Sequence, residues 1–130
     1  MRACVAIVLD SFLVLVFVLI GRASHHEAGG LAALARTAWP FLAGLAAGWV
    51  ATRAWRRPAA LVPAGVGAWL GAAAVGMALR IVAGQGTALA FILVALAVLG
   101  LLLLGWRGTA WLVSTHGQSQ QRLARRERAR

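Results

Sequence analysis

The chain has little of what a water-soluble domain normally carries. Among its 130 residues there are no lysines, no tyrosines, one cysteine and three acidic residues. Soluble domains are about one-quarter charged and under half apolar. This chain is 12% charged and 62% hydrophobic. These values exclude a soluble globular enzyme, a disordered chain and a nucleic-acid-binding module.

The single cysteine, Cys4, cannot form a disulfide within the chain, so no disulfide framework holds the fold. All 13 basic residues are arginines, and the formal net charge is +10. The arginines lie at the ends of apolar blocks and in a C-terminal tail. This placement indicates a lipid bilayer with anionic headgroups as the partner, and no nucleic acid.

The apolar residues fall into four stretches, each close to the roughly 20 residues that cross a bilayer. Backbone amides inside a membrane need partners within their own segment, so all four stretches should be helices. The sequence predicts an all-α polytopic membrane protein, with a four-transmembrane-helix bundle over residues 1–112. A basic cytoplasmic tail follows over residues 113–130, either as an amphipathic helix on the membrane or as a disordered segment. The expected spans are about 3–20, 37–52, 61–79 and 87–106.

The arginines also predict an orientation, because positive charge favours the cytoplasmic side of a membrane. Ten arginines belong to the N-terminus, the second loop and the C-terminal segment, against three on the other side. We therefore expect a multi-pass protein of the cell (inner) membrane with both termini in the cytoplasm.

Asp10 is the only acidic residue inside an expected span. A carboxylate at that depth costs about 2.5–3.5 kcal/mol on insertion scales, so it should face protein or water rather than lipid. One interpretation is a structural pair with an arginine of the same membrane side, for which Arg53 and Arg107 are the candidates. The other is a proton- or cation-coupled transport site.

Three arginines, Arg22, Arg36 and Arg80, are expected at the opposite, outer face. They could bind an anion or meet lipid headgroups there. The run His25-His26-Glu27 offers metal-ligand types, but adjacent positions rarely share one tetrahedral centre. We therefore expect a solvated loop at that run, no metal site and no cofactor.

Small residues recur four apart in the second and third spans, a spacing that lets helix backbones approach closely in lipid. Such faces serve either the bundle itself or contact with a second subunit. The glycines concerned are Gly44, Gly48, Gly67, Gly71 and Gly76.

Several short segments of the sequence form a recognisable combination. They are Asp10, Gly21-Arg22-Ala23-Ser24-His25, Thr37-Ala38-Trp39-Pro40-Phe41, Gly48-Trp49, Gly76-Met77-Ala78-Leu79-Arg80, Gly84-Gln85-Gly86 and Gly105-Trp106-Arg107. Together these segments resemble a known family of small prokaryotic membrane proteins, best represented in actinobacteria and grouped as domain of unknown function 3054. The resemblance covers nearly the whole chain except the arginine-rich tail. It implies a membrane location and carries no established activity.

The favoured interpretation is a non-enzymatic accessory or interaction subunit whose partner is a second copy of the chain or another membrane protein. The alternative is a small proton- or ion-coupled transporter or channel using Asp10. The lack of tyrosine argues against the small multidrug-resistance transporters, whose aromatic cages include that residue. An enzyme is not expected, because the spans offer only Asp10 and isolated hydroxyls.

Overall fold

The computed structural model describes residues 2–24 and 29–130, and within them every regular element is helical. The N-terminal half contains α1 (Ala3–Ser24) and α2 (Gly30–Thr52). A third, segmented helix follows, and a long helix, α5 (Leu89–Arg128), completes the described chain. In the part of the chain that the structure describes, four helices are long and apolar enough to cross a membrane. The predicted all-α class and number of spans are therefore confirmed.

The third span runs over Leu61–Val82 and changes helical geometry along its length. Its segments are η1 (Leu61–Gly65), α3 (Val66–Leu70), η2 (Gly71–Val75) and α4 (Gly76–Val82). Val62 has extended backbone angles, so the regular helix begins after it. The π-type turn of η2 begins at Gly71, and such turns locally widen a helix.

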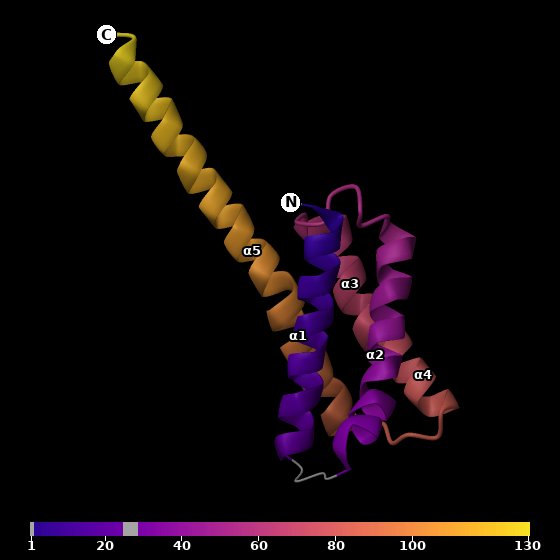
Figure 1. Cartoon of the computed structure of the whole chain (residues 1–130). Helices are drawn as coiled ribbons and strands as arrows, with labels where there is room; N and C mark the ends of the chain where they lie inside the picture. The colour runs from indigo at the N-terminus through magenta and orange to yellow at the C-terminus, as the bar shows by residue number, and fades with distance from the viewer. Residues whose placement is uncertain (1, 25–28) are drawn as a thin grey trace.

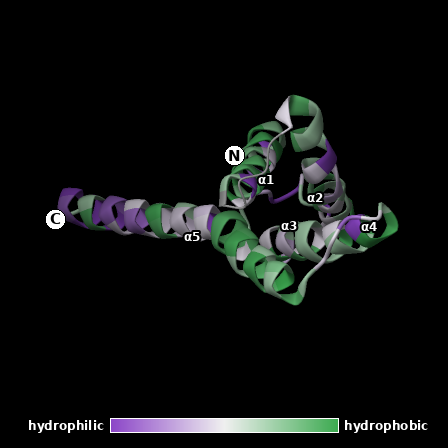
Figure 2. Ribbon diagram, turned by 90° about the horizontal axis from the view of Figure 1, so that it is seen from below, coloured by the Kyte–Doolittle hydropathy of each residue, from purple (hydrophilic) through white to green (hydrophobic). Residues whose placement is uncertain are grey.

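The four spans form a bundle in which α2 packs mainly against the third span, and α1 packs against both α2 and α5 (Figures 1 and 2). The N-terminus and the C-terminal half of α5 lie at the same end of this bundle (Figure 1). The hydrophilic half of α5 continues obliquely away from the other helices (Figure 2). Which end of the bundle faces the cytoplasm stays a prediction from the arginines.

Two helix bounds differ from the expected spans. The second helix begins at Gly30 rather than near residue 37, and α5 continues to Arg128 rather than ending near residue 106. The sequence lacks proline after Pro63, and the basic tail consists largely of residues with good helix propensity. Hydropathy falls after Val113, but nothing there breaks the helix.

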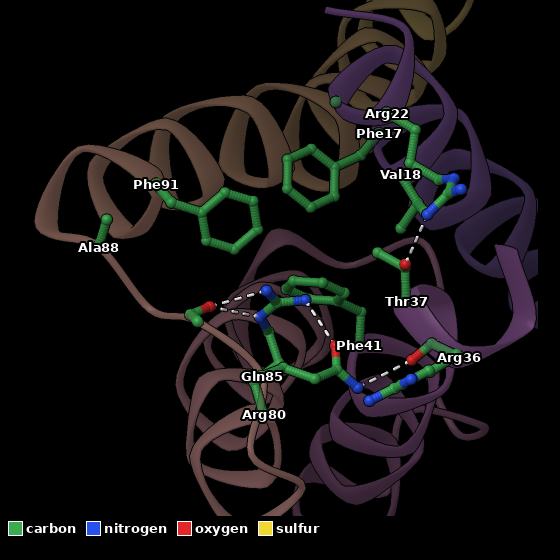
Figure 3. Close-up of a pocket in the computed structure, with 12 residues that line it drawn as sticks. Phe17, Val18, Arg22, Arg36, Thr37, Phe41, Arg80, Gln85, Ala88 and Phe91 are labelled. Atoms are coloured by element: carbon green, nitrogen blue, oxygen red, sulfur yellow. Dashed lines mark hydrogen bonds between the residues drawn. The ribbon is translucent and has the colours of Figure 1, made fainter. Parts of the chain in front are cut away.

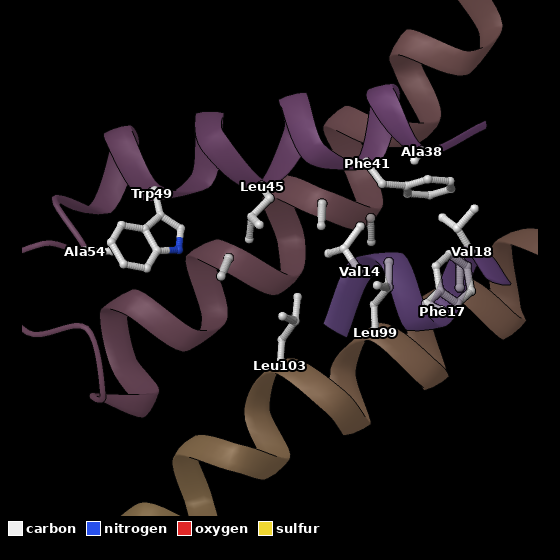
Figure 4. Packing of buried hydrophobic residues seen from close by; sticks show 14 of the residues in the cluster. Val14, Phe17, Val18, Ala38, Phe41, Leu45, Trp49, Ala54, Leu99 and Leu103 are labelled. Atoms are coloured by element: carbon white, nitrogen blue, oxygen red, sulfur yellow. The ribbon is translucent and has the colours of Figure 1, made fainter. Parts of the chain in front are cut away.

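The core lies on the bundle axis and is built from large side chains of α1, α2 and α5 against alanines of the third span (Figure 4). Phe17 and Phe41 meet edge to face, with ring centroids 5.3 Å apart. The third span contributes Ala64, Ala68, Ala72 and Ala73, all buried. Short side chains on this helix leave room for its neighbours to approach, which is the usual packing of helices in lipid.

Candidate functional site

Asp10 lies on the inward face of α1, and its side chain is 0% exposed. Arg107 of α5 approaches it with both terminal nitrogens, Nη1 at 3.0 Å from Oδ1 and Nη2 at 2.6 Å from Oδ2. The indole Nε1 atoms of Trp49 and Trp106 each donate to one carboxylate oxygen at 2.8 Å. Each oxygen therefore accepts two hydrogen bonds, and three helices contribute to one buried centre.

The guanidinium of Arg107 uses its other donors on backbone oxygens. Its Nε donates to the carbonyl of Pro58 at 2.9 Å, and Nη1 also donates to the carbonyl of Leu103 at 2.9 Å. The guanidinium carbon lies 4.5 Å from the centre of the Trp106 ring. In the described chain no buried side-chain nitrogen or oxygen lacks a partner. The two charges of this centre therefore pair with each other, and its buried hydrogen-bonding groups have partners within the described chain.

Arg53, the other arginine proposed as a partner for Asp10, lies elsewhere. It caps the C-terminus of α2 in a left-handed conformation (φ 50°) and is exposed. With Arg56 and Arg57 it lines a cavity of about 310 Å³. Of the two candidates, the structure brings only Arg107 to Asp10.

The two indoles are partners that the sequence analysis did not identify. The sequence does indicate that an indole could bond to Asp10, because a buried indole N–H needs an acceptor and Asp10 is the only acidic side chain in any expected span. Choosing these two of the six tryptophans requires knowing how each helix is rotated.

A second cluster lies at the opposite end of the bundle, where Arg22, Arg36 and Arg80 line one cavity of about 470 Å³ (Figure 3). These arginines come from α1, α2 and α4, so three separate helices supply the charges. Aromatic rings of Phe17, Phe41 and Phe91 form an apolar wall of the same cavity. The three arginines that the sequence predicted to share one face are therefore neighbours in space.

Arg80 is held in place by the turn that follows α4. Its Nε and Nη2 donate to the carbonyl of Gly86 at 3.2 and 2.7 Å, and Nη1 donates to Gln85 Oε1 at 2.9 Å. Gln85 Nε2 in turn donates to the carbonyl of Arg36 at 2.9 Å. The positive φ of Gly84 (75°) allows the chain to turn back here. The guanidinium carbon lies 4.7 Å from the centre of the Phe91 ring.

The glycines singled out for packing meet within the chain. A Cβ on Gly44 would overlap the carbonyl oxygen of Gly71, and a Cβ on Gly48 would overlap that of Gly67. At Gly76 a Cβ would lie 3.0 Å from the Phe41 ring. These glycines hold α2 against the third span, so a partner subunit has to use another surface.

Over residues 2–24 and 29–130, no group of three His, Cys, Asp or Glu side chains is placed to hold a metal ion. The run His25-His26-Glu27, expected to form a solvated loop, lies outside the described residues. Asp10 is the only acidic side chain in the transmembrane part of the described chain, and its bonds are all internal.

Residues 7–110 match the family described as protein of unknown function (DUF3054). The matched region contains Asp10, Arg107 and the three cavity arginines, and it stops before the basic end of α5. No curated protein and no solved structure matches the chain. The match covers most of the chain and confirms the family inferred from sequence motifs: the chain belongs to the DUF3054 family of proteins of unknown function.

Proposed function

We propose that the protein is a non-enzymatic accessory or interaction subunit of the cell (inner) membrane. The observation that carries the proposal is the projecting part of α5. The buried residues of α5 as a whole are Ala95, Leu99, Leu103 and Arg107, which are spaced four apart on one stripe of the helix. No residue of α5 beyond Arg107 is buried. Residues 108–130 are exposed or half-buried, so the described residues leave most of the surface of this part of the helix uncovered.

A long helix without tertiary contacts gains little stability in water, because most helical stability in proteins comes from packing of an apolar face. In this chain Trp111, Leu112 and Val113 are 59%, 51% and 67% exposed, and they begin one helical turn beyond the last buried residue. Five arginines follow over residues 122–130. An apolar segment joined to a basic helix suits contact with a membrane protein whose cytoplasmic face is acidic.

The transport alternative requires an acidic side chain that ions or water can reach. The Asp10 side chain is 0% exposed and accepts four hydrogen bonds from protein donors. Neither the cavity near Arg22 nor that near Arg53 is lined by Asp10. These observations favour a structural ion pair over a coupling site.

The cytoplasmic orientation of both termini is part of the proposal and is supported by the arginine distribution. Arg53, Arg56 and Arg57 follow α2 at the same end of the bundle as the N-terminus and the projecting helix. The positive-inside rule would place that end in the cytoplasm. The projecting helix would then be available to cytoplasmic or membrane partners.

Site-specific photo-crosslinking in native membranes tests the proposal. A photoreactive residue replaces Gln120 on the projecting helix, and in a control it replaces Leu101, which is 73% exposed on the bundle surface. We expect a discrete protein adduct from position 120 that disappears when Arg125 and Arg126 are changed to glutamate. An adduct at twice the mass of the chain identifies a second copy as the partner. No protein adduct from position 120 contradicts the proposed interaction role.

A further inference from the structure

We propose that the cavity lined by Arg22, Arg36 and Arg80 is a binding site for a phosphate group carried by an amphiphile, with an anionic lipid headgroup as its source. The cavity is about 470 Å³, within the range of roughly 300–1,000 Å³ typical of small-molecule sites. It lies at the end of the bundle opposite to the N-terminus, where helices begin or end (Figures 1 and 3). For a bundle that spans the membrane, this is the depth of the lipid headgroups.

Charge identifies the ligand as an anion. Three arginines line the cavity, and among the residues that the structure describes no acidic side chain lines it. The sequence has one further acidic residue between the first two spans, Glu27. The other two acids are remote, because Asp10 is paired with Arg107 and Glu127 lies on the projecting helix. Even with Glu27 counted against the three arginines, positive charge at this end of the bundle remains in excess.

The positively charged groups are arranged in advance of binding. The Arg80 guanidinium is fixed by Gly86 and Gln85 and stacks on Phe91. Arg22 Nη1 donates to Thr37 Oγ1 at 3.0 Å, which ties α1 to α2 across the cavity. Side chains already held in position lose less conformational entropy when a ligand arrives.

The chemistry of the lining favours a phosphate with an apolar extension. Arginine presents a planar fork of donors that matches phosphate oxygens, often in bidentate pairs. Phe17, Phe41 and Phe91 provide an apolar wall beside the charges. A ligand with an anionic head and a hydrocarbon portion satisfies both surfaces, whereas a free inorganic ion contacts only the arginines.

Binding to the purified full-length chain in neutral detergent tests this site. The probes are dioleoyl phosphatidic acid, phosphatidylcholine with the same chains, and inorganic phosphate. We expect phosphatidic acid to bind more tightly than phosphatidylcholine. Arg36→Gln and Arg22→Gln should each weaken phosphatidic acid binding about tenfold or more, because a charge-assisted hydrogen bond contributes about 1.5–3 kcal/mol. Arg122→Gln on the projecting helix is the matched control and should bind like the wild type.

Arg36 is exposed, so its glutamine variant is expected to fold, and an unchanged unfolding midpoint verifies this. Equal binding of inorganic phosphate and phosphatidic acid supports the phosphate site and assigns it to a soluble anion. Tighter binding of the lipid assigns it to a headgroup. Wild-type affinity in both folded cavity variants overturns the proposal. Weakened binding in Arg122→Gln alone also overturns it and locates lipid binding on the basic helix.

Discussion

At the scale of single residues, the carboxylate of Asp10 and the guanidinium of Arg107 form a fully buried ion pair. Burying an ion pair costs several kcal/mol per ion in lost solvation, and good geometry with further hydrogen bonds has to offset it. Here Arg107, Trp49 and Trp106 together supply four donors to the two oxygens. Removing one ion therefore leaves the other buried without its counter-charge.

We expect Asp10→Asn to lower the free energy of unfolding by about 3–5 kcal/mol, the usual cost of breaking a buried pair. The loss arises because Arg107 stays buried and charged without its carboxylate. Unfolding of the purified protein in detergent measures this loss of stability.

Glu127→Gln, the same kind of change from an acid to its amide at an exposed position, is the control and should leave stability unchanged. The double variant Asp10→Asn/Arg107→Gln should be less destabilised than Asp10→Asn alone. Equal stability of Asp10→Asn and wild type would contradict a structural pair.

The indole hydrogen bonds can be tested separately from the charge. Trp49→Phe removes a donor to a carboxylate, and Trp69→Phe removes a donor to the neutral carbonyl of Leu96. Hydrogen bonds to charged groups contribute about 1.5–3 kcal/mol, against about 0.5–1.5 for neutral ones. Both changes delete the same indole atoms, so Trp49→Phe should lower the unfolding midpoint more. A larger effect at Trp69 would show that ring packing, and not the acceptor's charge, controls the loss.

At the scale of helices, the contact between α2 and the third span depends on glycine. Gly44 and Gly48 face Gly71 and Gly67 so closely that backbone oxygens occupy the space of a side chain. Lipid provides no hydrophobic drive for helices to associate, so close van der Waals packing holds the two helices together. The neighbouring atoms belong to the backbone and cannot rotate away.

Gly48→Ala should therefore force the two helices apart. We expect a loss of at least about 1–3 kcal/mol in the free energy of unfolding, as for overpacked cores. Gly105→Ala on α5 is the matched control, because nothing lies within 4 Å of a Cβ placed there. Alanine is also the better helix former, so this variant should be as stable as wild type or slightly more stable. The thermal unfolding midpoints of Gly48→Ala and Gly105→Ala measure this difference. Similar losses in the two variants would refute the close-packing argument.

For the molecule as a whole, charge and shape differ between the two ends of the bundle. One end carries the N-terminus, Arg53, Arg56, Arg57 and the projecting basic helix, and the other carries the arginine-lined cavity. This polarity fits a single fixed orientation in the membrane, with the basic end inside. In that orientation the basic end would meet the cytoplasm and the cavity would meet the outer headgroups.

Cysteine labelling in intact cells measures the orientation. In a Cys4→Ser background, Ala83→Cys reports the end with the cavity, and Ser119→Cys reports the projecting helix. Both positions are exposed. A thiol reagent that does not cross membranes should label position 83 in intact cells and position 119 only after permeabilisation. The reverse pattern would place the basic end outside and contradict the positive-inside prediction.

The sequence by itself determined the four helical spans, because hydropathy over about 20 residues is a local property and lipid requires each segment to satisfy its own backbone. It also indicated that Asp10 faces protein or water, and it left Arg53 and Arg107 as alternative partners for a structural pair. Only the tertiary structure decided between them, since the choice depends on how α1 and α5 are rotated and offset along the bundle axis.

The same reason explains why the sequence did not place two indoles beside Asp10, and why it grouped three arginines at one face without showing that they share a cavity. The indoles of Trp49 and Trp106 reach Asp10 from helices far apart in the chain, and Arg22, Arg36 and Arg80 converge on one cavity. The position of each residue along its span indicates only its approximate depth in the membrane. The rotation of each helix and its packing against its neighbours bring these residues together, and these are properties of the bundle rather than of any single segment.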